Sequence, residues 1–283
     1  MIDITTLDRR GLDALLDMGS AEGWNLGRGD AAAFWAQDPA GFLGVSVDGT
    51  MAGGGSIVDY EGRYGFMGLF LVKPEFRGRG IGRSLWFERR DRLRSRLAPG
   101  APIGLAAVAA MRAFYERGGF RADHLEVRYE WTARAPDAPD VRVTDARGLP
   151  RAELVAFDAQ HFPAARPRFL DAWIAPADRV ALAVVDAGAI AGFAVSRPAT
   201  QGHRIGPLFA RDGAIAEALL SEIERRLPGT TLLLDVPESN PDAVALVLRR
   251  DARAVFSCTR MHHGPSPQLP WRRIFGVTSF ELG

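Results

Sequence analysis

The chain contains very little cysteine and lysine. Cys258 is the only cysteine and Lys73 the only lysine among 283 residues. A single cysteine excludes an intramolecular disulfide and a cysteine-rich zinc site, and it is typical of a reducing compartment. The formal net charge is only +1, so the composition indicates no polyanionic partner such as nucleic acid.

Long apolar runs are also missing. No segment reaches the roughly 18 apolar residues of a membrane-spanning helix. Residues 1–10 are polar and lack the apolar region of a secretory signal. We therefore expect a cytoplasmic protein that does not enter a membrane. Because 47% of the residues are hydrophobic, a chain of this length can bury one large core or two ordinary ones.

A short segment rich in proline, alanine and aspartate predicts a linker near the middle of the chain. Apolar periodicity stops at residues 134–140, which predicts two domains, at residues 1–134 and 140–283. In the first domain, hydrophobic patterning and turn signals predict helices and strands in alternation. We expect helices at 8–18, 30–37 and 110–117, an amphipathic helix beginning at 81, and strands at 41–47, 51–60, 64–72, 103–108 and 125–132.

The second domain repeats much of this order. We expect helices at 149–157, 215–227 and 242–250, strands at 179–186, 189–197, 202–209, 231–236 and 254–262, and a candidate strand at 274–282. The recurrence of element order, more than of residues, predicts an internal duplication. The expected fold class is therefore α/β, with a mixed sheet in each of two tandem units.

The most informative segment joins a strand, a glycine-rich loop and a helix. Residues 65–72 are apolar, Pro74 ends the strand, and the sequence Arg-Gly-Arg-Gly-Ile-Gly at 77–82 precedes an amphipathic stripe. Glycines let backbone N–H groups approach an anion without interference from Cβ. A helix start adds unpaired donors and a partial positive charge. The segment is therefore a candidate phosphate cradle.

The spacing of this loop separates three interpretations. Glycines 78, 80 and 82 give G-x-G-x-G, which does not match the dinucleotide fingerprint G-x-G-x-x-G. A plain turn would account for the glycines but not for the two arginines beside them. The spacing R-x-x-G-x-G of Arg77, Gly80 and Gly82 instead resembles the pyrophosphate loop of the GNAT N-acetyltransferase superfamily, which holds the diphosphate of acetyl-coenzyme A.

This resemblance implies acetyl-CoA as co-substrate, no metal, and a defined set of coenzyme-binding residues. They are Phe70, Leu71, Val72, Arg77, Gly78, Arg79, Gly80, Ile81, Gly82, Arg83 and Ser84. In GNAT transfer an amine attacks the thioester carbonyl directly, which forms a tetrahedral oxyanion. A backbone N–H within residues 70–72 would stabilise this oxyanion. The element order of the first domain is also the GNAT order.

The resemblance also suggests the groups that move protons. Residues 114–120 resemble a later GNAT motif, and Tyr115 is a candidate acid for the leaving thiolate because a phenol has an ordinary pKa of about 10. Alternatively, Tyr115 packs against the coenzyme or only donates a hydrogen bond to its sulfur. The strand at 64–72 has no carboxylate, so Glu22 and Asp59 are the candidate bases. If the amine arrives neutral, no base is needed.

The loop at residues 22–25 lies where GNAT domains, which the first domain resembles, place a loop over the acceptor. Trp24 offers a stacking face that attracts cations, and Asn25 offers both a donor and an acceptor. Both are therefore candidate substrate-binding residues. The alternative role of Trp24 is to fasten the loop to the core.

The second domain resembles the C-terminal domain of bacterial tandem-GNAT proteins. The segments that carry this likeness are 197–198, 202–210, 234–240 and 276–283. The loop at 210–215 has one glycine and the carboxylate of Asp212, which would repel a diphosphate. Asp251-Ala252 also stands where the resemblance implies a Gly-Phe pair, such as Gly119-Phe120 of the first domain. We therefore expect this domain to bind no coenzyme and to shape the acceptor site.

The histidines invite a metal hypothesis, which their spacing does not support. His161, His203, His262 and His263 fit no zinc pattern, and adjacent positions of a strand point to opposite faces. Arg197 and Arg204, with His203 between them in sequence, either line the cleft between the domains and bind an acidic part of the acceptor or form structural pairs.

Together these features predict an N-acetyltransferase that moves an acetyl group from acetyl-CoA to a primary amine of a small molecule by direct attack. The alternative is a non-catalytic acyl-CoA-binding sensor or regulatory module, which the missing strand carboxylate favours. The sequence leaves open the acceptor, the acyl-chain length and the oligomeric state. It contains no clustered basic face of the kind that binds nucleic acid.

Overall fold

The structure is a computed structural model that describes residues 1–134, 140 and 142–283. Most of the predicted linker at 134–140 lies outside the described residues. The first half of the chain contains eight strands and four α-helices. They are β1 (Ile2–Thr6), α1 (Arg9–Ala21), α2 (Asp30–Gln37), β2 (Phe42–Val47), β3 (Thr50–Ser56), β4 (Val58–Tyr60), β5 (Tyr64–Phe66), β6 (Leu71–Val72), α3 (Ile81–Arg96), β7 (Ile103–Ala107), α4 (Arg112–Arg117) and β8 (Arg121–Thr132).

The second half has seven described strands and four described α-helices. They are β9 (Val143–Asp145), α5 (Arg151–Asp158), α6 (Pro167–Ile174), β10 (Val180–Asp186), β11 (Ala189–Pro198), β12 (His203–Ala210), α7 (Gly213–Arg226), β13 (Thr231–Pro237), α8 (Pro241–Leu248), β14 (Arg253–His263) and β15 (Ile274–Gly276). Short 3-10 helices at 74–76, 109–111, 146–148 and 271–273 connect some of these elements.

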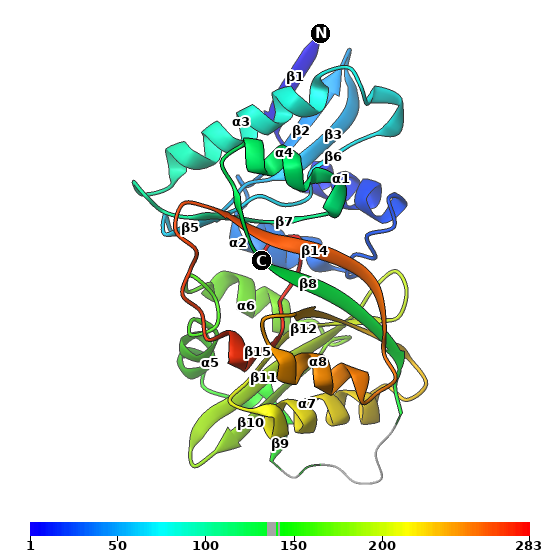
Figure 1. The fold of residues 1–283 in the computed structure, drawn as a ribbon, viewed down its shortest axis with the longest axis vertical. Helices are drawn as coiled ribbons and strands as arrows, with labels where there is room; N and C mark the ends of the chain where they lie inside the picture. Colours follow the sequence, from blue (N-terminus) through cyan, green and yellow to red (C-terminus); the bar gives the residue numbers. More distant parts are fainter. Residues whose placement is uncertain (135–139, 141) are drawn as a thin grey trace.

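The halves exchange their last long strands (Figure 1). A four-stranded sheet has the order β1-β2-β3-β6, and a larger sheet runs β4-β5-β7-β14-β8-β13-β12-β11-β10-β9, with β15 paired to β12. Strand β8, from the first half, pairs with β13 of the second half. Strand β14, from the second half, pairs with β7 of the first half. One sheet therefore runs continuously through both halves.

The predicted strand at 64–72 is divided into β5 and β6, and this division leaves a gap between two strands of the first half. Strand β5 runs parallel to β7, with Gly65 opposite Ile103, whereas β6 pairs with β3 in the other sheet. The chain turns between them at Leu69, whose φ is 49°. Buried Arg89 of α3 fixes this turn by donating to the carbonyls of Ser56 and Gly68, each at 2.7 Å. Strands β6 and β7 consequently diverge.

In the second half, β15 fills the corresponding gap, which lies between β12 and β13. Strand β12 runs parallel to β13 over its first three residues, and β15 then lies between the two strands, paired with β12. The backbone N–H of Val277 donates to the Asp235 carbonyl at 2.9 Å. A Cβ on Gly206 would lie 2.4 Å from the Thr278 carbonyl oxygen, so only glycine fits there. The predicted strand at 274–282 ends at residue 276.

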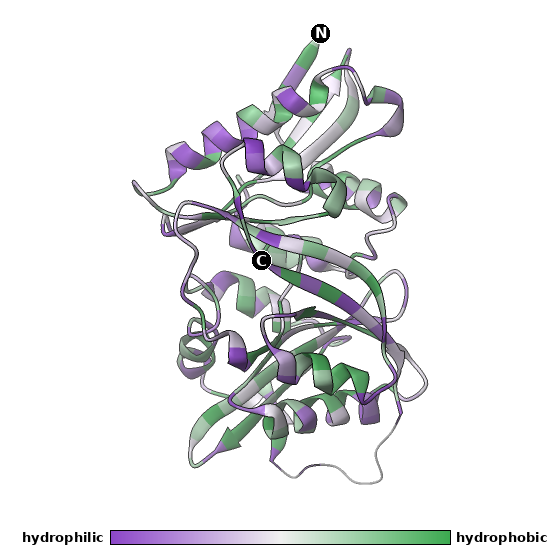
Figure 2. Cartoon of the chain, in the orientation of Figure 1, coloured by the Kyte–Doolittle hydropathy of each residue, from purple (hydrophilic) through white to green (hydrophobic). Residues whose placement is uncertain are grey.

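Buried aromatic side chains join the two halves. The rings of Phe34 and Trp173 stack at 6.3 Å between centroids, and those of Tyr60 and Phe162 meet edge to face at 4.8 Å. Figure 2 shows hydrophobic residues concentrated on β10, β11 and α8, whereas α3 at the surface is largely hydrophilic. The sequence did not predict β1, β9 or α6, and the predicted strand at 51–60 divides into β3 and β4.

Candidate functional site

The glycine-rich loop leaves the N-terminus of α3 uncapped. Gly78 and Gly80 have φ of 75° and 78°, a left-handed conformation that glycine adopts without strain. Gly80 occupies the N-cap position and supplies no side-chain acceptor, so the first N–H groups of the helix remain unpaired donors. Gly82 has an ordinary φ, and a Cβ there would touch Val72 at 3.5 Å, a normal contact.

The arginine side chains of the glycine-rich loop and of the start of α3 make different contacts. Arg77 donates from Nε to the Val72 carbonyl at 2.7 Å and from Nη2 to the Glu22 carboxylate at 2.5 Å. Arg79 and Arg83 lie over the rings of Phe76 and Phe87, at 5.6 and 5.7 Å from the centroids. Ser84 Oγ lies 3.5 Å from the Gly80 carbonyl. Glu22 is therefore tied to the loop.

Strand β6 offers a free backbone edge to the opening. It pairs on one side with β3, where Leu71 is opposite Gly54 and the Lys73 N–H donates to the Ala52 carbonyl at 2.8 Å. Because bonded and non-bonded positions alternate in an antiparallel pair, the N–H group of Val72 points away from β3. This N–H group faces the gap between β6 and β7.

A cavity of about 100 Å³ lies at the divergence of β6 and β7. The first half contributes Trp24, Met67, Gly68, Leu69, Phe70, Ala106, Val108, Met111, Tyr115 and Arg128. The second half contributes Phe256, Cys258, Phe280 and Glu281. We call this cavity the shared pocket.

Tyr115 is buried in the wall of the shared pocket. Its ring lies 5.1 Å from that of Trp86, between centroids, and 6.4 Å from that of Phe120. Burial raises the pKa of the Tyr115 phenol to about 12, although the nearby Arg89 guanidinium opposes the shift. The phenol is therefore neutral at physiological pH and available as a hydrogen-bond donor.

The loop at residues 22–25 is attached to the second half. Trp24 lines the shared pocket, and its carbonyl accepts a hydrogen bond from Arg128 at 3.0 Å. Asn25 accepts from the Gln201 N–H at 2.8 Å and donates to the Gln201 carbonyl at 3.0 Å. The side chain of Asn25 is thus engaged in joining the halves and does not line the shared pocket.

Neither candidate base lines the shared pocket. Glu22 pairs with Arg77, as described above. Asp59 Oδ1 accepts from the Gly62 N–H at 2.7 Å, in the turn between β4 and β5. A carboxylate that the sequence interpretation did not single out, Glu281, does line the pocket. It belongs to the C-terminal segment, which passes so close to Gly68 that a Cβ there would lie 1.9 Å from the Glu281 carbonyl oxygen.

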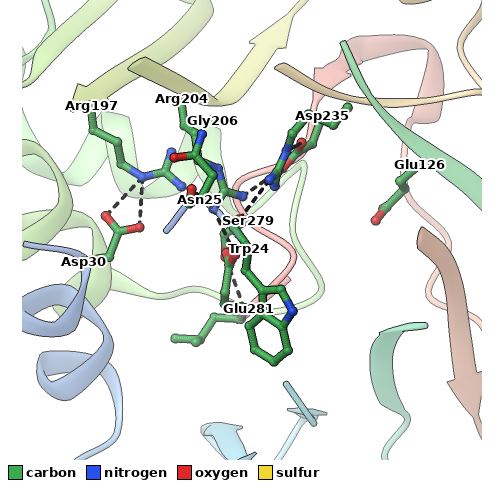
Figure 3. Close-up of polar contacts among 12 residues, drawn as sticks. Trp24, Asn25, Asp30, Glu126, Arg197, Arg204, Gly206, Asp235, Ser279 and Glu281 are labelled. Carbon is green, nitrogen blue, oxygen red and sulfur yellow. Dashed lines mark hydrogen bonds and ion pairs between the residues drawn. The ribbon is translucent and has the colours of Figure 1, made fainter. Parts of the chain in front are cut away.

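A network of buried ion pairs (Figure 3) adjoins the shared pocket, whose lining includes Arg128 and Glu281. Asp235 accepts from Arg128 at 2.6 and 2.9 Å and from Arg204 at 2.9 Å. Burial favours the neutral acid, but Arg128 and Arg204 outweigh it and lower the pKa of Asp235 to about 2. Arg197 pairs with Asp30 at 3.0 Å. Of the two interpretations of Arg197 and Arg204, structural pairing agrees with these contacts.

His203, His262 and His263 lie beside three different side chains. His203 lies 3.5 Å from Ser196 Oγ, and burial lowers its pKa. His262 lies near Asp123, and His263 near Arg94. Within residues 1–134, 140 and 142–283, no group of three or more histidine, cysteine, aspartate or glutamate side chains could hold a metal ion. The same residues include no helix long and apolar enough to cross a membrane.

The helix of the second half that corresponds to α3 is capped. Asp212 Oδ1 accepts from the Ile215 N–H at 3.0 Å, at the N-terminus of α7. Arg211 pairs with Asp212 at 3.2 Å and with Asp186 at 2.7 Å. A carboxylate thus occupies the position that an anion would take, and β15 occupies the opening between the strands.

Comparisons with known proteins agree with this duplicated architecture. Residues 12–120 match the acetyltransferase (GNAT) family, and residues 154–276 match an acetyltransferase (GNAT) domain. Holothin acyltransferase from Pseudoalteromonas sp. (strain SANK 73390) is 27% identical over 266 residues, which cover 93% of this chain and 88% of the relative.

Two solved structures extend the likeness to the fold. A putative acetyltransferase from Pyrococcus horikoshii has a TM-score of 0.85 at 22% identity, over 100% of this chain and 96% of the other. A tandem GNAT protein from the clavulanic acid biosynthesis pathway has a TM-score of 0.65 at 14% identity, over 94% and 100%. The predicted mixed α/β fold is confirmed, and the chain belongs to the GNAT family as an acyltransferase with two tandem GNAT domains.

Proposed function

We propose that the first half binds acetyl-CoA and transfers its acetyl group to a primary amine of a small molecule. One observation carries this proposal. The uncapped N-terminus of α3 lies at the end of the free edge of β6, and this edge leads into the shared pocket beside Tyr115. The diphosphate would bind at residues 77–84, and the pantetheine arm would lie along β6.

Direct attack needs few protein groups in this arrangement. The amine nitrogen forms a bond to the thioester carbon, and the N–H of Val72 stabilises the oxyanion. The carbon–sulfur bond then breaks, and Tyr115 donates a hydrogen bond to the leaving thiolate. The surplus proton on nitrogen passes to solvent, and the thiolate takes up a proton from solvent. Burial raises the pKa of the Cys258 thiol, so this cysteine remains protonated and makes a poor nucleophile.

The second half would contribute walls of the acceptor site and no coenzyme site. The cap by Asp212 and the insertion of β15 support this division, and so do the four residues that the second half gives to the shared pocket. Holothin, on which the relative acts according to its name, is the first acceptor to offer.

A non-catalytic acyl-CoA-binding module is the second candidate. It is favoured by the absence of both Glu22 and Asp59 from the lining of the shared pocket. Turnover separates the two functions. Release of free coenzyme A with holothin or a panel of small amines supports the enzyme, whereas binding of acetyl-CoA without release supports the sensor.

Calorimetric titration with acetyl-CoA tests the coenzyme site. We expect one site per chain, and a Gly80→Asp variant should weaken binding by about 100-fold, or about 2.7 kcal/mol, because it places a carboxylate beside the diphosphate. Gly100→Asp is the matched control, since Gly100 also has a positive φ, 80°, and open space around it. Unchanged binding by Gly80→Asp, or two sites per chain, would overturn the assignment.

A further inference from the structure

We propose that Glu281, from the second half, binds the N–H group of the acceptor amine in the shared pocket. The proposal rests on the function proposed above, because it takes the thioester to lie beside β6. Glu281 gives the shared pocket a carboxylate, which the strand predicted at 64–72 lacks. It also gives the second half a direct part in recognising the substrate.

The hydrogen bonding of Glu281 is incomplete. The side chain is 5% exposed. Its Oε1 accepts from Arg204 at 2.9 Å, whereas Oε2 is buried and has no hydrogen-bond partner among the described residues. Leaving a buried carboxylate oxygen unpaired is costly. A donor that enters the shared pocket would satisfy this oxygen.

The charge on Glu281 defines what it can bind. Burial raises the pKa of the Glu281 carboxyl, but Arg204 and Arg128 outweigh burial, so this pKa lies below its ordinary value. The group is therefore ionised at neutral pH and accepts hydrogen bonds without donating any. Such a carboxylate favours an amine and disfavours a carbonyl or carboxylate at the same position.

The other walls indicate the body of the acceptor. Around the cavity are the aromatic side chains of Trp24, Phe70, Phe256 and Phe280, together with Met67 and Met111. These surfaces suit a flat or apolar group. We therefore expect a small amine attached to an aromatic or apolar body, with no anionic group beside the nitrogen.

The C-terminal segment holds Glu281 in a fixed place. Tyr60 donates to the Leu282 carbonyl at 2.8 Å, and Arg166 donates to Thr278 Oγ1 at 2.8 Å. Ser279 Oγ accepts from the Leu282 N–H at 3.1 Å. A preorganised carboxylate can orient the lone pair of the amine toward the thioester and stabilise the positive charge that develops on nitrogen as the N–C bond forms. The nitrogen proton then leaves to solvent.

Binding of simple probes tests Glu281 without needing turnover. Ligand-observed NMR in the presence of coenzyme A would compare benzylamine with benzyl alcohol, which has the same ring but no amine. The wild type should bind benzylamine at least about tenfold more tightly. A Glu281→Gln variant should lose this preference, because Arg204 retains the carboxamide oxygen and turns the NH₂ group toward the pocket.

A second buried glutamate provides the matched control. Glu224 is also 5% exposed, but both its oxygens are paired, with Trp131 at 2.8 Å and Arg250 at 3.0 Å, outside the shared pocket. Glu224→Gln should keep the preference for the amine. If Glu281→Gln fails to bind coenzyme A, Glu281→Asp replaces it, and its shorter side chain should weaken benzylamine binding and leave benzyl alcohol unchanged.

The outcomes separate this proposal from the proposed function. Retention of the preference by Glu281→Gln with normal coenzyme A binding overturns the role of Glu281, and so does a wild type that does not prefer the amine. Preferential binding of the amine without any acetyl transfer overturns the enzyme assignment and leaves Glu281 in place. With an active acceptor, Glu281→Gln should raise the KM for the amine about tenfold and leave the KM for acetyl-CoA unchanged.

Discussion

At the scale of single residues, the acid role proposed for Tyr115 depends on the pKa of its phenol. A thiol has an ordinary pKa of about 8.5, well below the value of about 12 to which burial raises the phenol. Complete transfer of the phenolic proton to the thiolate is therefore unfavourable. A hydrogen bond from the neutral phenol to the departing sulfur agrees better with this environment than full proton transfer.

Tyr115→Phe should reduce kcat by about tenfold, the loss of roughly one such hydrogen bond or 1.4 kcal/mol. The affinity of this variant for acetyl-CoA, measured by calorimetry, should equal that of the wild type, because the ring still packs against Trp86. Since the raised pKa keeps the donor protonated up to about pH 11, the wild-type rate should show no loss from Tyr115 between pH 6 and 10. A basic limb near pH 9 that the variant removes would contradict this assignment.

At the scale of elements, the two openings explain how one fold gives a proposed active half and a structural half. The gap between β6 and β7 stays open, whereas β15 fills the gap between β12 and β13. The glycine-rich loop was predictable because its residues are consecutive. The division at Leu69 was not, because an apolar run does not show which neighbour each part will pair with. Glu281 was missed because only long-range packing brings it to Gly68.

Gly68 should therefore be sensitive to the smallest substitution. Gly68→Ala would place a Cβ 1.9 Å from the Glu281 carbonyl oxygen, so the C-terminal segment must shift. We expect a loss of about 1–3 kcal/mol in the free energy of unfolding, the usual cost of overpacking, and reduced acetyl transfer with normal acetyl-CoA binding. Gly213→Ala, which meets no atom within 4 Å, is the control for thermal unfolding and activity. Equal melting temperatures for the two variants would refute the close contact.

At the scale of the whole molecule, the halves depend on each other for their sheets. Strand β8 lies between β13 and β14, and β14 lies between β7 and β8, so each half completes the sheet of the other. The duplication was visible in the order of elements along the chain. The exchange was not, because β8 and β14 carry the same patterning whether they pair within their own half or across. The ion pairs between Arg128 and Asp235 add a buried connection between the halves.

This exchange of strands predicts that the two halves unfold as one cooperative unit. The complete chain should unfold in a single calorimetric transition, because neither half can lose its sheet without exposing strands of the other. Fragments 1–134 and 140–283, expressed separately, should show no cooperative transition, since β8 and β14 would each lose partners and leave unpaired edges. Co-expression of the two fragments should restore one transition and acetyl-CoA binding. A fragment 1–134 that unfolds cooperatively and binds acetyl-CoA with the affinity of the whole chain would show that the exchanged strands are dispensable for the coenzyme site.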